Sequence, residues 1–234
     1  MSESGETPKG NASYRHHDIE PVRRPRQAAA GSYDRLSRWY DLVAVSEQAF
    51  VNEGLAMLDA GPDEKVLEIG FGTGRALVEL ARRVGKSGSV CGVDLSPEMV
   101  KRSRDRIEDA GYGDRVTLTT GDAVSLRYAE QSFDALFMSF ILELLAAGDL
   151  ADVLRECLRV LRNGGRMAVV SLSKEGGPYP VRRLYEWARR LAPTLLDCRP
   201  IYTARCLEQN GFNLRTVRTR CMWGMPVEMV LATA

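Results

Sequence analysis

The chain has 234 residues, which is enough for one domain with a sizeable buried core. Hydrophobic residues make up 44% of it and charged residues 27%, the ordinary mix of a soluble globular protein. The formal net charge is +1, so the chain as a whole lacks the strongly basic character of nucleic-acid-binding proteins. The basic residues are unevenly spread, because residues 174–220 hold ten Lys and Arg against four Asp and Glu.

The cysteines and the apolar runs indicate in which cellular compartment the protein is expected. There are five cysteines, an odd number with no C-x-x-C pair, which favours reduced thiols over a disulfide framework or a zinc site. No apolar run is long enough to span a bilayer, and no signal peptide is apparent. We therefore expect a cytoplasmic protein without a metal site.

The first predicted segments are a tail and a helix. Residues 1–31 are rich in Gly, Pro, Arg and small residues and are expected to form a mobile N-terminal tail, which carries both histidines of the chain. From Ser32 to about Leu58 an apolar stripe predicts a helix. We expect residues 32–234 to form a single domain with this N-terminal helix as a lid.

Short apolar runs then alternate with helical patterns. The predicted strands are 65–69, 89–94, 115–120, 133–139 and 166–172. The predicted helices are 75–83, 97–110 and 150–161, with Ser96 capping the second and Asn163-Gly164-Gly165 ending the third. Strands that alternate with helices in this way indicate an α/β fold with a mostly parallel, doubly wound sheet.

The C-terminal part follows a different pattern. Helices are predicted at 181–191 and 203–210, followed by strands at 213–221 and 226–231. Only four residues separate these two strands, which is too few for a parallel crossover. The sheet should therefore end in an antiparallel C-terminal hairpin.

The most informative segment is Glu68-Ile69-Gly70-Phe71-Gly72-Thr73-Gly74, where a strand ends and a helix begins. Glycine tolerates positive φ and lets a ligand approach the backbone, and open α/β sheets bind ligands at this strand end. The start of the following helix also favours negative charge or hydrogen-bond acceptors.

Two familiar phosphate-binding patterns do not fit. The dinucleotide fingerprint G-x-G-x-x-G would need a third glycine at Arg75 or Leu77, according to the frame. The P-loop pattern that Gly85-Lys86-Ser87 suggests would need a glycine at Leu80. A glycine turn without any ligand remains the third alternative.

Two acidic residues follow the next strands. Asp94 ends the second strand, where a carboxylate can accept hydrogen bonds from ribose hydroxyls, although it could instead cap the following helix. Asp122, in Gly121-Asp122-Ala123, follows the third strand and can accept a hydrogen bond from an adenine amino group, although Gly-Asp pairs are common in turns. With the glycines, they outline a cleft for a nucleoside with a charged amino-acid arm.

At this point the chain resembles a known family. E-x-G-x-G-x-G, the strand-terminal Asp94, the Gly-Asp-Ala turn and L-R-x-G-G-R before the fifth strand are similar to class I S-adenosylmethionine-dependent methyltransferases. Within that family they resemble the branch of the ubiquinone/menaquinone C-methyltransferases and their small-molecule relatives. The resemblance covers roughly Ser32 to Ala234. It implies a Rossmann-like, seven-stranded sheet with an antiparallel last strand, and S-adenosylmethionine as cofactor.

The resemblance also implies roles for individual residues. The methionine arm would lie along Glu68, Gly70, Phe71, Gly72, Thr73 and Gly74; the ribose and adenine would contact Asp94, Leu95, Met99, Asp122 and Ala123. Ser139 would lie near the reacting methyl group. Tyr33 and Tyr40 resemble elements that close the cofactor pocket, with plain core packing as an equally weighted alternative.

A methyl group on a sulfonium is already electrophilic, so the protein mainly aligns the reactants, and a base is needed only if the acceptor must lose a proton. The catalytic candidates are Glu143, Tyr179 and Tyr202. Glu143 could instead be a helix residue facing solvent, and the tyrosines could be packing residues. Tyr185 is a further candidate for the acceptor pocket.

The acceptor class follows partly from missing motifs. Related enzymes that methylate amino groups of nucleic-acid bases have a [DN]-P-P-[YFW] turn after the fourth strand, where this chain has Ser139-Phe140-Ile141-Leu142. Enzymes that methylate C5 of a base use a cysteine nucleophile next to a proline, and this chain has no Pro-Cys pair. A small-molecule acceptor, quinone-like or lipid, is therefore the main prediction, and no specific nucleic acid is predicted. The alternatives are a nucleic-acid or protein methyltransferase that docks through the basic C-terminal third, and a non-catalytic S-adenosylmethionine-binding module.

The arginines of helix 181–191 suggest a further possibility. Arg182, Arg183, Arg189 and Arg190 share the polar side of this predicted helix. Such a helix could make a peripheral contact with an anionic membrane and admit a lipid or quinone acceptor. A lid helix packed on the sheet, with its arginines in water, is the favoured alternative.

Overall fold

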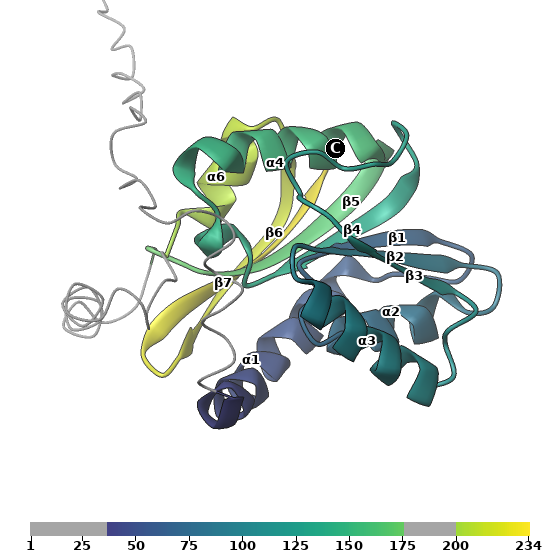
Figure 1. Ribbon diagram of the computed structural model, residues 1–234. Coiled ribbons are helices and arrows are strands. Elements are labelled where there is room, and N and C mark those ends of the chain that lie inside the picture. The colour runs from purple at the N-terminus through teal and green to yellow at the C-terminus, as the bar shows by residue number, and fades with distance from the viewer. Residues whose placement is uncertain (1–36, 176–199) are drawn as a thin grey trace, which may run out of the picture.

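A computed structural model describes residues 37–175 and 200–234. They form one open, twisted sheet of seven strands with helices on both faces (Figure 1). The strand order across the sheet is β3-β2-β1-β4-β5-β7-β6. The strands are β1 (Lys65–Ile69), β2 (Ser89–Asp94), β3 (Val116–Thr120), β4 (Phe133–Ser139), β5 (Leu161–Leu172), β6 (Asn213–Met222) and β7 (Met225–Thr233).

The pairing confirms the predicted mixed sheet. The strands β3, β2, β1, β4 and β5 are parallel neighbours, whereas β7 runs antiparallel to both β5 and β6. Only Trp223 and Gly224 separate β6 from β7, and both have positive φ, 51° and 81°. Two positive φ angles in a two-residue loop match the twist of a β-hairpin, so the predicted C-terminal hairpin is confirmed.

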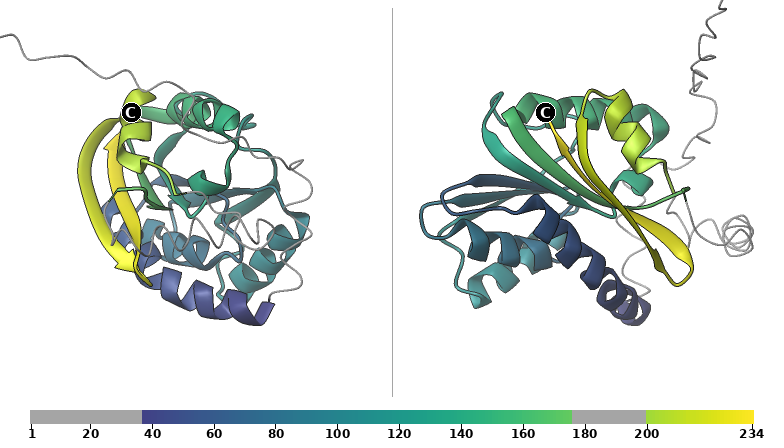
Figure 2. Two further views of the ribbon diagram at one scale, coloured as in Figure 1. Left: turned by 90° about the vertical axis from the view of Figure 1, so that its left-hand side faces the viewer. Right: turned by 180° about the vertical axis from the view of Figure 1, so that it is seen from behind.

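The helices divide between the two faces, as the view from behind in Figure 2 also shows. One face carries α1 (Ser37–Leu58), α2 (Arg75–Val84) and α3 (Pro97–Asp109), and the other carries α4 (Ala147–Val160) and α6 (Thr203–Gln209). A short 3-10 turn, η4 (Leu142–Leu144), follows β4. None of the helices in the described ranges is long and apolar enough to cross a membrane.

The two faces hold separate buried clusters because side chains alternate along each strand. On β1, Val66 packs in the same cluster as Leu77 and Leu80 of α2. Its neighbour Leu67 packs in the opposite cluster, which includes Leu154 of α4. Strands buried on both faces explain the nearly continuous apolar runs that mark β1 and β4 in the sequence.

One boundary prediction was wrong. The residue pattern predicted a helix over 150–161 and a strand over 166–172, whereas α4 starts at Ala147 and ends at Val160, and β5 starts at Leu161. Leu161 pairs with Phe133, and the register shifts before Arg166 pairs with Ala135. The Asn163-Gly164-Gly165 run therefore lies inside an irregular strand, because tertiary pairing of Leu161 outweighs the local tendency of these residues to form a helix stop.

The helix α1 extends from the amino ends of the parallel strands to their carboxyl ends. Arg166, near the amino end of the parallel strands, donates to the carbonyl of Asp59 just beyond α1 and forms an ion pair of 2.7 Å with Glu64. At the other end, the Ser46 hydroxyl lies 3.7 Å from the Met222 sulfur, next to the hairpin turn. The first part of α1 therefore lies near the carboxyl ends of β4 and β5.

Several predicted features lie outside the described residues. They are the tail 1–31, the start of the first helix with Tyr33, the residue Tyr179, and the predicted helix 181–191, which contains Tyr185. Tyr40 lies within α1, but the described side chains begin further along that helix.

Candidate active site

The carboxyl ends of β1, β2, β3 and β4 meet along one edge of the sheet, and the predicted site residues follow them. The register pairs Ile69 with Val93 and Met138, so the turns after these three strands are neighbours. Asp94 pairs in turn with Thr120, directly before Gly121 and Asp122. The fold thus brings the glycine turn, both aspartates and Ser139 to one edge.

The three glycines of the turn have different surroundings. All have positive φ: 69° at Gly70, 52° at Gly72 and 77° at Gly74. A Cβ added at Gly70 would lie 2.2 Å from the Ile141 side chain, and one at Gly74 would lie 2.8 Å from the Ser103 hydroxyl. A Cβ at Gly72 would meet no atom within 4 Å. Only Gly72 therefore leaves its Cβ side open for a ligand.

Asp94 links the glycine turn to the next helix. Its Oδ2 accepts a hydrogen bond of 3.0 Å from the Gly72 N–H, and its Oδ1 accepts one of 2.9 Å from the Ser96 N–H. Ser96 itself caps α3, because its hydroxyl accepts from the Met99 N–H. The predicted cap at Ser96 is confirmed, and the alternative cap by Asp94 is wrong. Burial raises the pKa of Asp94, against the effect of these N–H donors.

Side chains of α3 also contact the glycine turn. The Ser103 hydroxyl of α3 is fully buried and donates a 2.8 Å hydrogen bond to the Gly72 carbonyl. Arg106, one turn further along α3, donates to the Thr73 hydroxyl at 3.3 Å. The Phe71 side chain points into the core, since a Cβ on Gly92 would lie 2.7 Å from its ring. These contacts with α3 and the core fix the conformation of the glycine turn.

Glu68 is the unusual group of the site. Its side chain is 1% exposed, and its Oε2 is buried with no hydrogen-bond partner within the described part of the chain. Burial raises the pKa of Glu68 well above its ordinary value, and the nearby charge of Asp94 raises it further. A buried carboxylate without a donor costs free energy, so a positively charged or N–H-bearing ligand would stabilise it.

The nucleoside end of the predicted site is more open. Leu95 is 51% exposed, and Met99 is half-buried in the first turn of α3. The Asp122 carboxylate accepts from the Val124 N–H at 3.1 Å, which shapes the loop after β3. Ala123 in the same loop is partly buried.

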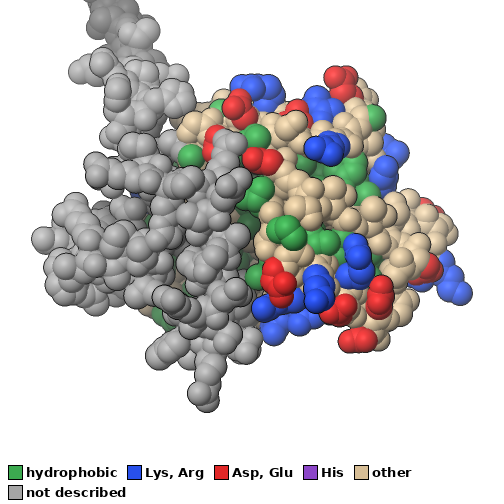
Figure 3. Space-filling model, viewed as in Figure 1, with side chains coloured by type: hydrophobic (Ala, Val, Ile, Leu, Met, Phe, Trp, Pro, Cys, Tyr) green, Lys and Arg blue, Asp and Glu red, His purple; other side chains and the backbone are tan. Residues whose placement is uncertain are grey.

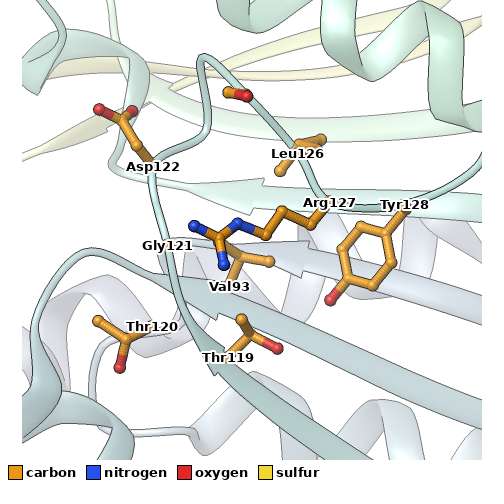
Figure 4. Close-up of a pocket in the computed structure, with 9 residues that line it drawn as sticks. Val93, Thr119, Thr120, Gly121, Asp122, Leu126, Arg127 and Tyr128 are labelled. Carbon is orange, nitrogen blue, oxygen red and sulfur yellow. The ribbon is translucent and has the colours of Figure 1, made fainter.

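A pocket of about 180 Å³ adjoins this end of the site. Val93, Thr119 and Gly121 line it together with Leu126, Arg127 and Tyr128 (Figure 4). The Arg127 side chain extends across it toward Gly121, whereas the Asp122 carboxylate points away from it. The face seen in Figure 3 carries apolar side chains between the charged residues of α3 and α4, and both charge signs are interspersed there.

The structure corrects the alternative that Glu143 faces solvent. The residue lies in η4, and its side chain is 1% exposed. Its Oε2 accepts from the Ser171 hydroxyl at 2.8 Å and its Oε1 from the Leu172 N–H at 3.1 Å. Burial raises its pKa to about 7. Sequence periodicity missed this because the burial comes from β5, about thirty residues further along the chain.

The remaining predicted residues are less informative. Ser139 ends β4 at the shared edge, as predicted. Tyr202 precedes α6, and its ring packs beneath the Lys174 ammonium and the Arg205 guanidinium, at 5.8 and 5.1 Å from its centroid. Sequence reasoning missed Ser103, Ile141 and also Glu47, a half-buried residue of α1 whose pKa is raised by burial and by the charge of Glu143. Only Ser103, a polar residue on the apolar side of α3, left a signal that could have found it.

Known proteins match the central part of this chain. Residues 66–165, which span β1 to the glycines of β5, match the family model of a methyltransferase domain. This range of the chain is therefore similar to a methyltransferase domain. The matched range contains the glycine turn, both aspartates and Glu143, so the site described above lies within it.

Part of the chain is also similar to curated proteins. The methyltransferase GfsG of Streptomyces halstedii is 34% identical over 136 residues, 58% of this chain and 48% of the relative. The ubiquinone/menaquinone biosynthesis C-methyltransferase UbiE of Methylococcus capsulatus is 33% identical over 162 residues, 68% of this chain and 62% of the relative. The chain thus spans about half to three-fifths of these relatives. The matches confirm the resemblance to class I methyltransferases of this branch.

Solved structures confirm the fold. SpnF, a [4+2]-cyclase, superposes with a TM-score of 0.70 at 16% identity, covering 92% of this chain and 98% of SpnF. A geranyl diphosphate methyltransferase, solved with geranyl diphosphate and sinefungin, gives 0.65 at 19% identity, covering 80% and 77%. The predicted Rossmann-like, seven-stranded fold is confirmed.

Proposed function

We propose that this chain is an S-adenosylmethionine-dependent methyltransferase that acts on a small molecule. The observation that carries the proposal is the buried, unpartnered Oε2 of Glu68, which lies near Asp94, the residue that binds the Gly72 N–H. A carboxylate in this position suits a ligand arm that brings positive charge or N–H donors. The methionine arm of S-adenosylmethionine carries both an ammonium and a sulfonium.

The other residues of the edge fit the rest of this cofactor. Asp94 keeps free lone pairs on both carboxylate oxygens after accepting one N–H each, so it can also accept from ribose hydroxyls. The exposed Leu95 supplies an apolar surface for a purine ring. When bound, the cofactor supplies an electrophilic methyl group; the chain supplies its binding, its orientation and a buried surrounding.

The proposed acceptor is a small molecule, with quinone-like compounds as the leading class. Support comes from the relatives named for ubiquinone and menaquinone biosynthesis and from the geranyl diphosphate methyltransferase, which all share this domain or fold. The helix 181–191 behind the membrane alternative lies outside the described ranges, as do five of the ten basic residues behind the nucleic-acid alternative. No observation on the described residues favours those alternatives.

The decisive test is calorimetric titration of the Asp94→Ala variant with S-adenosylhomocysteine, the demethylated product. Loss of two hydrogen bonds to a charged acceptor should weaken binding about tenfold to a thousandfold. An analogue without ribose hydroxyls should bind the wild type about as weakly as the variant binds the full ligand. In the variant, removing these hydroxyls should cause no further loss.

The control is Asp114→Ala, which removes an exposed aspartate that pairs with the neighbouring Arg115. It should bind S-adenosylhomocysteine like the wild type. Undiminished binding by Asp94→Ala, or no binding by the wild type, would refute the proposed cofactor site. Transfer of labelled methyl groups to a panel of quinol precursors, small alcohols, RNA and protein then identifies the acceptor class.

A further inference from the structure

Glu143 occupies the part of the shared edge where an acceptor would meet the cofactor. It follows β4 by four residues, and Ile141, two residues before it, packs against Gly70 of the glycine turn. The carboxylate therefore lies beside the methionine end of the proposed site and not at its nucleoside end. The residue is absent from the cofactor contacts proposed above, so its burial there requires another explanation.

The carboxylate is held rigidly but without a countercharge. The Ser171 hydroxyl and the Leu172 N–H each donate to one of its oxygens, at 2.8 and 3.1 Å. No salt bridge formed by the described residues includes Glu143. Each oxygen retains a lone pair, so the group can accept one more hydrogen bond or a proton.

A second buried acid and an unused hydroxyl lie around the same strand end. Ser171 pairs in register with Glu228 of β7, so their side chains are neighbours on one face of the sheet. Glu228 is 1% exposed and accepts from the Ala204 N–H at 3.3 Å. Thr203, adjacent to Ala204, is fully buried, and its hydroxyl has no partner within the described residues. We call Glu143, Ser171, Thr203 and Glu228 the Glu143 cluster.

The Glu143 cluster has more acceptor capacity than the donors around it use. It also contains an unpartnered hydroxyl that can donate to an oxyanion. A molecule with an ionisable O–H group would supply the missing donor and, after losing its proton, the missing acceptor. Phenols, enols and quinols share this chemistry.

We infer that Glu143 is the proton acceptor for an ionisable hydroxyl group of the methyl acceptor, an inference that rests on the proposed function. In this step the O–H bond of the acceptor breaks and its electron pair remains on the oxygen. The proton passes to a carboxylate oxygen of Glu143. Ser171 is a positioning residue, because its hydroxyl fixes the direction of the carboxylate.

The raised pKa values of Glu143 and of its neighbour Glu47 agree with this role. Burial raises the pKa of Glu143 to about 7, where a base is half ionised near neutral pH and can both accept and release a proton. Glu47 of α1 faces the same group: burial, followed by the charge of Glu143, raises its pKa to about 7. Glu228, on the other side of Ser171, is the third acid facing the site.

The test uses the full chain saturated with S-adenosylhomocysteine and titrated with 2-naphthol and with its methyl ether. The two probes differ in one substituent, because a methyl group replaces the hydroxyl proton in the ether. At pH about 8, where Glu143 is mostly ionised, we expect naphthol to bind about tenfold or more tightly than the ether. At pH about 5.5 the preference should fall several-fold, because the carboxyl is then protonated.

Two variants distinguish recognition of the probe by Glu143 from non-specific binding of the probe. Glu143→Gln keeps the shape and an acceptor for Leu172 but should lose both the naphthol preference and its pH dependence. Glu208→Gln, which changes an exposed glutamate of α6, should retain both. Equal binding of the two probes, no binding of either, or an unchanged preference in Glu143→Gln would each overturn the inference. Failure of the wild type to bind S-adenosylhomocysteine would instead contradict the proposed function.

Discussion

At the scale of single residues, the glycines of the turn serve different purposes. Gly70 and Gly74 have positive φ and also face protein atoms that a Cβ would strike, whereas Gly72 has positive φ and faces open space. The motif E-x-G-x-G-x-G is therefore partly a packing motif, and only its central glycine leaves the Cβ side free. Alternating glycines alone could not show this, because Ile141 and Ser103 come from other elements.

This difference predicts how three alanine substitutions should behave. Gly111→Ala is the matched control, with φ of 76° and no atom within 4 Å of a new Cβ, so it should cost about 1 kcal/mol of unfolding free energy. Gly72→Ala should cost a similar amount but also weaken S-adenosylhomocysteine binding about tenfold or more. Gly70→Ala should destabilise by about 2–4 kcal/mol, because the methyl group would also displace Ile141.

Denaturant unfolding and calorimetry on the same three variants measure both effects. If Gly72→Ala binds the ligand as tightly as Gly111→Ala does, the open side of Gly72 does not face the cofactor.

At the scale of elements, α1 is positioned by close contact with the middle of the sheet. A Cβ on Gly54 would lie 2.4 Å from the Val170 methyl group and 3.2 Å from the Phe137 ring. The helix therefore approaches β4 and β5 more closely than any larger residue would permit. This approach brings Glu47, two turns earlier in the same helix, to the strand ends that carry Glu143.

Gly54→Ala should consequently destabilise the protein although alanine favours helix. The gain in helix propensity is about 1 kcal/mol, whereas the overlap with Val170 and Phe137 should cost about 2–3 kcal/mol. Gly148→Ala in α4 is the matched control, because a Cβ there meets nothing within 4 Å. It should stabilise by about 0.5–1 kcal/mol. Thermal and urea unfolding compare the two, and stabilisation by Gly54→Ala would contradict the close contact.

At the scale of the whole molecule, buried acids make stability depend on pH. The pKa values of Glu47 and Glu143 are raised from 4.5 to about 7 in the folded state. Between these values the folded protein holds protons that the unfolded chain has released. The stabilisation is therefore complete below pH 4.5 and is lost as pH rises through about 7.

Glu47→Gln should remove part of this dependence. Relative to the wild type, the variant should gain about 1–2 kcal/mol of unfolding free energy on going from pH about 5 to about 8. Urea unfolding at both pH values measures the gain, with Glu208→Gln as an exposed glutamate control. Parallel pH profiles for the wild type and Glu47→Gln would show that Glu47 titrates alike in the folded and unfolded states.

Local patterns in the sequence were sufficient for most of the fold. The period of apolar residues located β1 to β4, α2 and α3, because burial on one or both faces leaves its own spacing in the chain. Turn length predicted the hairpin, since four residues cannot form a crossover. The glycines, Asp94 and Asp122 could be predicted as one site because parallel strands end at a common edge.

Tertiary structure alone decided the features that depend on contacts between distant elements. It showed that Leu161 belongs to β5, that Gly70 packs against Ile141, and that Glu143 is buried against β5, close enough for its charge to raise the pKa of Glu47. Burial, and the pKa shift it causes, depend on which groups exclude water from a side chain. Those groups come from remote parts of the chain, so no local pattern records them.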